Sequence, residues 1–256
     1  LEKNTEGQTN IAFGFSVLQN NTTGDANTAI GNRSMETNTT TGGHTAVGYQ
    51  ALRDNNAGSS NTGVGYQVLA YNISGSTNVA TGHTAMRTNT SGSYNTATGY
   101  RALYSNTTAS KNTAHGYKSL YNNTTGGNNT AFGYNAMAST DNATNQTIIG
   151  YEATGQADNS VVLGNDDVTA VYMGEDSGAK VYAGEASFTG NMTIGGDVVV
   201  SSDLRLKANI VSLGSTLAKL LLIDGKTYTM KKNGKQKIGV LAQDIQKVFP
   251  ELVTTD

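Results

Sequence analysis

Ser202 and Lys207 are the residues of this sequence whose types could perform covalent chemistry. They lie at a border where the Asn, Thr, Gly and Ala of the preceding chain give way to Leu, Ile, Lys and Val. A serine hydroxyl becomes a nucleophile when a base removes its proton, and a lysine can be that base when burial lowers its pKa. Five residues of separation do not put both side chains on one face of a helix or strand, so the chemistry needs a turn between Asp203 and Leu206. An arbitrary serine and lysine at this spacing would be solvated linker residues. The sequence around them must therefore show whether this pair is catalytic.

The composition is unusual for a globular protein. The 256 residues include 31 Gly, one Pro, no Cys and no Trp, and 14% of them are charged. The net charge of −2 argues against nucleic-acid binding, which would leave a basic footprint. The missing cysteines exclude disulfides, and no apolar run approaches the length of a membrane-spanning helix, so we expect no membrane insertion. No signal peptide is visible. Because the sequence begins at Leu1 and not at Met, it is compatible with an upstream piece that has been removed.

A repeat of 17 residues organises the first part of the chain. The copies are variants of Asn-Thr-Ala-x-Gly, with Asn in seven of nine and Ala in seven. An aromatic residue usually follows the glycine, Leu or Met stands four positions after it in eight copies, and a phrase such as Asn-Thr-Thr-Gly closes the copy. We call the glycine that ends the first phrase the repeat glycine; its copies are Gly14, Gly31, Gly48, Gly65, Gly82, Gly99, Gly116, Gly133 and Gly150.

Each phrase has a conformational preference. Asn-Thr-Ala-x-Gly predicts a short strand that ends where φ is positive, Ala-x-Leu predicts a second short apolar element, and Asn-Thr-Thr-Gly predicts a turn. One copy cannot be stable alone, but stacked copies pair their backbones and align Ala on Ala, Leu on Leu and Asn on Asn. The repeat therefore predicts a β-solenoid, and nine rungs at about 4.8 Å would extend on the order of 40 Å.

The last step is shorter, because Gly164 follows Gly150 by 14 residues through Asn159-Ser160-Val161-Val162-Leu163. This phrase resembles the head repeat of trimeric autotransporter adhesins, and the 17-residue copies resemble the same rung with a longer turn, as in phage tail fibres and bacterial surface proteins. The resemblance covers roughly residues 10–165. It implies an all-β fold, a homotrimeric left-handed parallel β-roll, for a rod domain at residues 1–165.

Residues 166–201 break the period. Short alternating segments such as Val171-Tyr172-Met173 and Val198-Val199-Val200 favour a β-rich neck or stalk in a fibre. The alternative is a globular sheet in which Gly195 and Gly196 form a hairpin turn.

Residues 202–256 predict a small α+β domain. We expect a capped helix at residues 215–222, two strands at 226–230 and 237–241 around an Asn233-Gly234 turn, and a helix at 243–249 that Pro250 ends.

Two motifs in this region resemble the C-terminal intramolecular chaperone domain of phage tail spikes and fibres, including endosialidases. They are Ser202-Asp203-x-Arg205-Leu206-Lys207-x-Asn209-Ile210 and, from Ile238, the run Ile-Gly-Val-Leu-Ala-Gln-Asp-Ile-x-Lys-Val-Phe-Pro-Glu-Leu-Val. The resemblance implies that the domain trimerises, guides folding of the fibre before it and is released by self-cleavage between Ser201 and Ser202, with Ser202 and Lys207 as a catalytic dyad. In the family the domain continues into long helices, so a sequence that stops at Asp256 is expected to hold its N-terminal part.

Other candidate sites are weaker. His44, His83 and His115 occupy three different repeat positions, so they do not predict a metal site, and we expect no cofactor. The tyrosine row could stack on sugars but favours packing between rungs or subunits. The repeat itself generates the glycosylation sequons, at Asn21, Asn38, Asn72, Asn106 and Asn123. Residues 55–140 contain no Asp or Glu, so the paired carboxylates of a glycosidase are missing there.

These features together predict a trimeric phage tail fibre or spike. It would attach the virion to a host surface glycan or protein receptor and contact other virion tail proteins. The alternative is a secreted or cell-surface bacterial adhesin with the same parts. An endosialidase-like enzyme would need a further catalytic domain, so at most a single-turnover self-cleaving peptidase is expected.

Overall fold

The computed structural model describes residues 1–171, 222–223, 225–229, 236–239 and 242–248. The chain divides into two compact units, Leu1–Lys180 and Val181–Asp256, and each is described by itself. Several predicted features lie outside the described residues: Ser201, Ser202, Lys207, most of the predicted neck, and residues 215–221 of the helix predicted at 215–222. The division into domains at 1–165, 166–201 and 202–256 stays a prediction.

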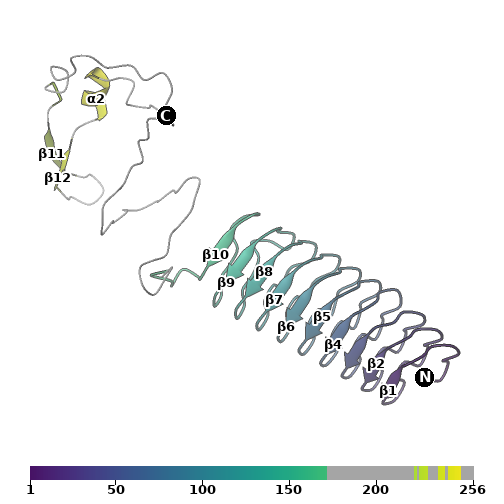
Figure 1. Ribbon diagram of the computed structural model, residues 1–256. Helices are drawn as coiled ribbons and strands as arrows, with labels where there is room; N and C mark the ends of the chain where they lie inside the picture. The colour runs from purple at the N-terminus through teal and green to yellow at the C-terminus, as the bar shows by residue number, and fades with distance from the viewer. Residues whose placement is uncertain (172–221, 224, 230–235, 240–241, 249–256) are drawn as a thin grey trace, which may run out of the picture. The chain divides into compact units, whose positions relative to one another are not determined.

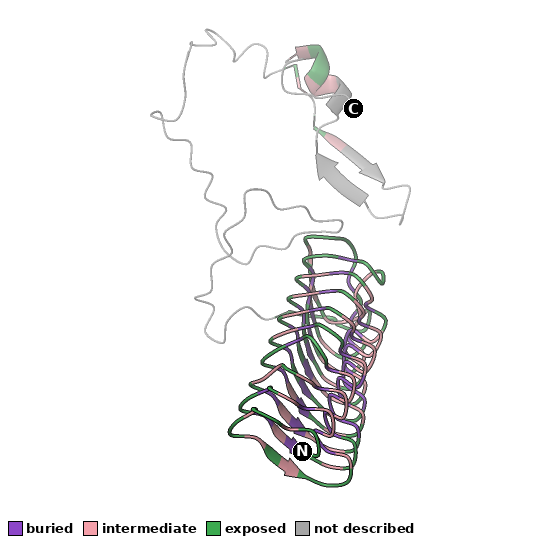
Figure 2. Ribbon diagram, turned by 90° about the vertical axis from the view of Figure 1, so that its right-hand side faces the viewer, coloured by how far each residue is buried: buried purple, intermediate pink, exposed green. Residues whose placement is uncertain are grey.

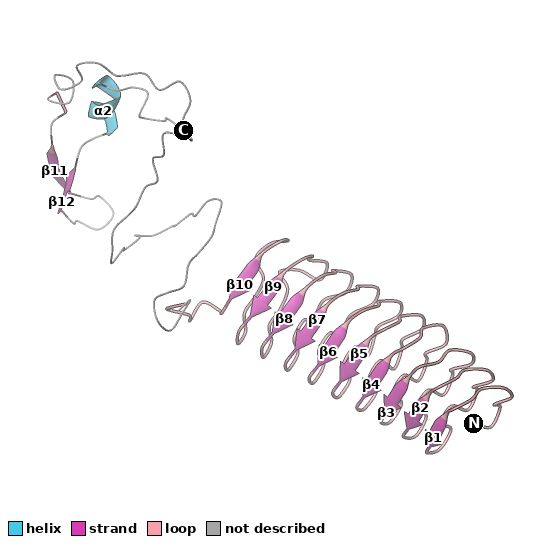
Figure 3. Ribbon diagram, in the orientation of Figure 1, coloured by secondary structure: helices cyan, strands magenta, loops and turns pink. Residues whose placement is uncertain are grey.

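The first unit is a parallel β-solenoid in which each rung contributes one strand of three residues (Figures 1 and 3). The ten strands form one sheet in sequence order, and each residue pairs with its counterpart 17 residues later until the final step. The final step is 14 residues, so Val161 pairs with Thr147. The predicted parallel solenoid is confirmed, whereas its left-handed sense and the homotrimer stay predictions. The strands are β1 (Ile11–Phe13), β2 (Thr28–Ile30), β3 (Thr45–Val47), β4 (Thr62–Val64), β5 (Val79–Thr81), β6 (Thr96–Thr98), β7 (Thr113–His115), β8 (Thr130–Phe132), β9 (Thr147–Ile149) and β10 (Val161–Leu163).

The middle residue of each strand points into the solenoid. It is alanine in seven strands, and from β2 onward Ala29, Ala46, Ala80, Ala97, Ala114 and Ala131 have no exposed surface. Figure 2 shows the resulting buried line along the inside of the strands. The repeat glycine ends the strand at φ between 122° and 147° in all nine copies, as predicted. A Cβ at Gly82 would overlap the carbonyl oxygen of Gly99, so the position requires glycine for both reasons.

The predicted second apolar element is a turn in which alternate residues have positive φ. Leu52 has φ 51° and Gln50, two residues earlier, has φ 53°, and this pattern recurs from rung to rung. Such angles are costly for residues with a Cβ, so the stack must stabilise them. It does so by burying the Leu52 side chain completely and by accepting its backbone N–H at the carbonyl of Val68, 3.0 Å away. The sequence motif located the core residue correctly but not its backbone conformation.

Two asparagine ladders run through the interior. In the first ladder, four residues before the repeat glycine, the backbone N–H of Asn95 donates to Oδ1 of Asn78 over 3.0 Å. In the second ladder, Nδ2 of Asn89 donates both to Oδ1 of Asn72 over 2.6 Å and to the carbonyl of Gly92 over 2.9 Å. These side chains are fully buried or nearly so, and each rung satisfies polar groups of the next. The second ladder consists of Asn21, Asn38, Asn55, Asn72, Asn89, Asn106 and Asn123.

The second unit contains a β-hairpin and a helix among its described residues. Strand β11 (Lys226–Thr229) pairs antiparallel with β12 (Gln236–Gly239), and α2 spans Ala242–Val248. The strands and helix expected at 226–230, 237–241 and 243–249 are confirmed to within two residues at each end. The Asn233-Gly234 turn that would join the strands lies outside the described residues.

Candidate functional site

The predicted catalytic pair, Ser202 and Lys207, lies outside the described residues. In the first unit, the described surface is the exterior of the solenoid. Among all the described residues, no helix is long and apolar enough to cross a membrane. The side chains of the solenoid exterior repeat in columns, since every rung presents the same position at the same place. Three features of this exterior bear on function, namely a ring stack, a row of cations and a shallow pocket, and a histidine buried in the interior bears on stability.

An aromatic column runs along the solenoid at the position after the repeat glycine. Seven consecutive rungs place rings there, and neighbouring ring centres are 4.8 to 5.4 Å apart. The side chains stay partly exposed, but their faces cover one another, so mainly ring edges meet solvent. Packing between rungs, one of the two roles expected for the tyrosine row, is confirmed, and a sugar would find free faces only beyond the ends of the stack. The column contains Tyr49, Tyr66, His83, Tyr100, Tyr117, Tyr134 and Tyr151.

His44 replaces asparagine in the first ladder. Its Nδ1 accepts a hydrogen bond from the backbone N–H of Asn61 over 3.1 Å, and its Nε2 lies 3.2 Å from Oγ1 of Thr41. Burial lowers the pKa of His44 to about 4, because water no longer stabilises the charged ring. The neutral imidazole therefore performs the acceptor role of an asparagine Oδ1.

The three histidines occupy separate columns. His44 lies in the ladder, His83 stacks between Tyr66 and Tyr100, and His115 stacks on Phe132 with ring centres 4.7 Å apart. Among the residues described, no group of three histidine or carboxylate side chains could hold a metal ion. Each histidine has a structural role that its column explains.

The sequon asparagines Asn21, Asn38, Asn72, Asn106 and Asn123 belong to the second ladder. Asn21, Asn38, Asn72 and Asn106 have no exposed surface and Asn123 is 2% exposed. Each of the five side-chain amides already donates two hydrogen bonds, one across the rungs and one to its own turn. A glycan could not be attached to these nitrogen atoms in the folded solenoid. These five sequons are thus a by-product of core packing, whereas the sequence pattern alone predicts only a turn for the same phrase.

A row of cations lies beside the aromatic column, and sequence reasoning missed it. The guanidinium of Arg87 lies 4.8 Å from the ring centre of Tyr71 and donates to the hydroxyls of Tyr71 and Tyr104 over 3.0 and 3.1 Å. Arg101 lies 5.4 Å from the ring centre of Tyr104. Lys118, one rung further, lies 5.6 Å from that of Tyr121. We call these side chains the basic–aromatic strip: Tyr71, Arg87, Arg101, Tyr104, Lys118 and Tyr121.

The sequence signal for this strip was available. The acid-free stretch at residues 55–140 argues against glycosidase chemistry, and it also leaves its cations without carboxylates. Arg87, Arg101 and Lys118 follow one another on consecutive rungs. Their approach to one another in space depends on the rung geometry, which the sequence alone did not provide.

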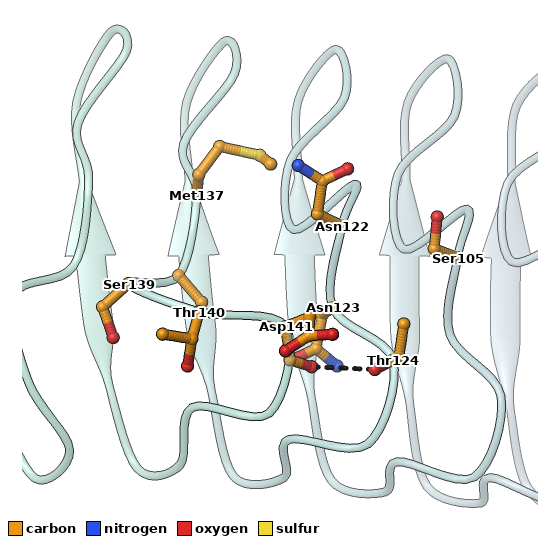
Figure 4. A pocket seen from close by; sticks show the side chains of 9 residues that line it. Ser105, Asn122, Asn123, Thr124, Met137, Ser139, Thr140 and Asp141 are labelled. Atoms are coloured by element: carbon orange, nitrogen blue, oxygen red, sulfur yellow. Dashed lines mark hydrogen bonds between the residues drawn. The ribbon is translucent and has the colours of Figure 1, made fainter.

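A shallow polar pocket of about 480 Å³ lies where the second asparagine ladder ends (Figure 4). Asn122, Asn123 and Thr124 form one side, and residues 137–141 of the next rung form the other. Oγ1 of Thr124 donates to the carbonyl of Asp141 over 3.2 Å, which ties the two rungs together. Asp141 supplies the one carboxylate in the lining, so the paired carboxylates of a glycosidase are not present in this pocket.

Comparisons with known proteins agree with the two-part organisation. Residues 202–254 match the family model described as chaperone of endosialidase. The long tail fiber protein Gp37 of Escherichia phage AR1 is 40% identical over 68 residues, which cover 23% of this chain. The match spans only 6% of the length of that relative. No solved structure matches the chain.

The repeat solenoid, the chaperone segment and the similarity to a long tail fibre protein fit a phage tail fibre with a chaperone domain. They support a structural role in a tail fibre, and they are consistent with a location in the virion tail.

Proposed function

We propose that this chain is a segment of a trimeric phage tail fibre that attaches the virion to its host and matures by releasing its C-terminal chaperone. The observation that carries the proposal is the order of the parts. An in-register solenoid, which has no enclosed catalytic cleft among its described residues, is followed in the same chain by the segment at residues 202–254 that matches the chaperone family. The fibre relative favours a virion over a bacterial surface as the setting.

An exposed apolar column supports the trimer. It lies one residue before the repeat glycine, on the outer side of the strands, and Phe13 and Phe132 there are 75% and 55% exposed. Thr81, Thr98 and His115 interrupt this column, so its apolar residues form one group on the first four rungs and a second group on the last three. Exposed apolar groups of this kind often mark contacts with another protein surface. We propose that both groups pack against other copies of the chain; they consist of Phe13, Ile30, Val47 and Val64, and of Phe132, Ile149 and Leu163.

The proposed cleavage uses Ser202 as nucleophile and Lys207 as base. Neutral Lys207 would take the proton from the Ser202 hydroxyl, whose oxygen attacks the carbonyl carbon of Ser201. The peptide C–N bond breaks, and Lys207 gives its proton to the freed amino group of Ser202. An ester between the Ser202 oxygen and the Ser201 carbonyl then joins the two residues. Water then hydrolyses this ester and separates the fibre from the chaperone.

Mass spectrometry and light scattering on the purified full chain test the proposal. We expect a trimer and two fragments, one that ends at Ser201 and one that begins at Ser202. A monomer would overturn the trimeric fibre, and an intact chain in an assembled trimer would overturn the cleavage. Adsorption of the fibre to host cells tests attachment separately.

A further inference from the structure

The charge of the solenoid is distributed unevenly along its length. Residues 55–140 hold Arg87, Arg101, Lys111 and Lys118 and no carboxylate, whereas acidic residues lie before and after them. None of these four cations forms an ion pair within the described part of the chain. By contrast, Arg53 is paired with Asp54 and Arg33 with Glu36. The middle rungs therefore present positive charge that the chain itself does not neutralise.

The basic–aromatic strip holds three of these cations in defined positions. Tyrosine rings support the charged groups of Arg87, Arg101 and Lys118, and such contacts fix a side chain without cancelling its charge. The Nε atoms of Arg87 and Arg101 are buried and have no hydrogen-bond partner. Unpaired buried donors are unusual in folded proteins. A ligand cannot reach these buried atoms, but Arg101 and Lys118 donate no side-chain hydrogen bond within the described part of the chain, so their remaining donors are free for an anion.

We propose that the basic–aromatic strip binds an anionic polysaccharide, through carboxylate or phosphate groups on successive sugars. This inference rests on the proposed attachment role, for which it names the ligand class and the surface. Arg101 and Lys118 occupy the same repeat position on consecutive rungs, so these two present charge about 4.8 Å apart along the solenoid, and Arg87 lies on the rung before them. Hydroxyl and amide side chains of neighbouring columns, such as Ser105 and Asn122, supply hydrogen bonds for sugar hydroxyl groups.

The geometry disfavours other anionic partners. Side chains on one face of an extended peptide recur at about 6.8 Å, twice the rise per residue, which does not match the rungs. Single-stranded nucleic acids bind by stacking bases on open aromatic faces. In the strip, Tyr104 stacks on Tyr121 with ring centres 5.2 Å apart, and guanidinium groups lie over other faces. The strip offers charge and ring edges rather than stacking platforms.

The test measures binding of the full-length fibre to defined polymers by surface plasmon resonance. The probes are polygalacturonate, phosphomannan, neutral mannan, polyglutamate and a single-stranded oligonucleotide. We expect binding to polygalacturonate or phosphomannan that weakens as salt is raised, and little binding to mannan. The preferred polymer distinguishes carboxylate from phosphate recognition. Equal binding to mannan, or stronger binding to polyglutamate or the oligonucleotide, would overturn the proposal.

Variants assign the binding to the strip. The double substitution Arg101→Gln and Lys118→Gln should weaken polysaccharide binding about tenfold or more. Arg33→Gln is the matched control, because Arg33 occupies the same repeat position but is paired with Glu36. Lys118→Arg keeps the charge and should keep the affinity. Unchanged binding by the double variant would overturn the proposal, and circular dichroism verifies that each variant is folded.

The same variants separate this inference from the proposed function. Host adsorption that persists in the double variant would refute the strip as the receptor site and leave the attachment role intact. Strip-dependent polysaccharide binding by a fibre that does not adsorb to cells would refute attachment and leave the strip as a saccharide site.

Discussion

The backbone amide of Asn61 donates a hydrogen bond to Nδ1 of His44 over 3.1 Å, at the place where other rungs offer an asparagine oxygen. The imidazole can accept this bond only while Nδ1 carries no proton. A group that titrates has thus been built into a ladder whose other members do not.

Acid should therefore destabilise the solenoid through His44. Its pKa is about 4 in the folded chain against 6.5 for an ordinary histidine, so the unfolded chain binds the extra proton between these values. The free energy of unfolding should fall as the pH drops from 6.5 to 4, by about 3 kcal/mol in all. Melting temperatures measured by circular dichroism at pH 7.5 and 4.5 should show this loss. His44→Asn should remove it and His115→Asn should not; equal acid sensitivity in His44→Asn would contradict the assignment.

The second asparagine ladder should be sensitive to a single deletion. Asn89→Ala removes the acceptor for Asn106 and the donor for Asn72 and Gly92, all of them buried. Because unpaired buried polar groups are costly, we expect a loss of about 2–3 kcal/mol in the free energy of unfolding. Denaturant titration measures it. Asn122→Ala at the exposed neighbour of the ladder should change stability by less than about 0.5 kcal/mol, and comparable losses in both variants would argue against the ladder.

Gly63 and Val68 should be energetically coupled. Gly63 replaces the inward alanine of its strand, and a Cβ there would lie 3.0 Å from Cγ1 of Val68. Gly63→Ala alone should cost about 1 kcal/mol through overpacking. With Val68→Ala, which gives the Ala–Ala pair found in four other rungs, the cost of Gly63→Ala should disappear. A double-mutant cycle of unfolding free energies measures the coupling, and strict additivity would refute it.

Replacement of Lys207 should show whether this residue acts as a general base or only through its positive charge. Lys207→Arg keeps a positive charge but cannot supply a neutral amine, because arginine does not lose its proton in proteins. We expect Lys207→Arg and Ser202→Ala to abolish release of residues 202–256, measured by mass spectrometry of the assembled fibre. Lys219→Arg is the control and should release the fragment normally. Cleavage by Lys207→Arg would show that this lysine is not the base.

The period of the sequence predicted the strands accurately because every rung repeats the same short strand at the same repeat position. Ala46 and Leu52 could be assigned to the interior from their recurrence alone. The backbone of the Leu52 turn could not, because its positive φ is stabilised by the carbonyl of Val68 on the next rung rather than by a local preference. Asn89 was missed as a core residue for a similar reason, since Asn-Thr-Thr-Gly also satisfies an ordinary turn.

The functional surface was less predictable than the fold. The chaperone segment could be identified from motifs, because the residues around Ser202 and Ile238 follow a recognisable order. The basic–aromatic strip could not be identified from the sequence. Arg101 and Tyr104 belong to no motif, and they form a strip only because the fold brings residues of neighbouring rungs beside them. The cleavage dyad stays a prediction.

The equal spacing of the rungs bears on how such a fibre acquires its length. If 17 residues were duplicated or deleted within the repeats, Ala would still meet Ala and Asn would still meet Asn across the new junction. Unequal recombination between repeats could therefore alter the reach of the fibre in steps of about 4.8 Å without requiring a new fold. The same interchangeability would allow a folding chain to slip by one rung, and the irregular residues oppose this. His44, the Gly63–Val68 pair and the 14-residue final step act as register marks that distinguish one rung from the next.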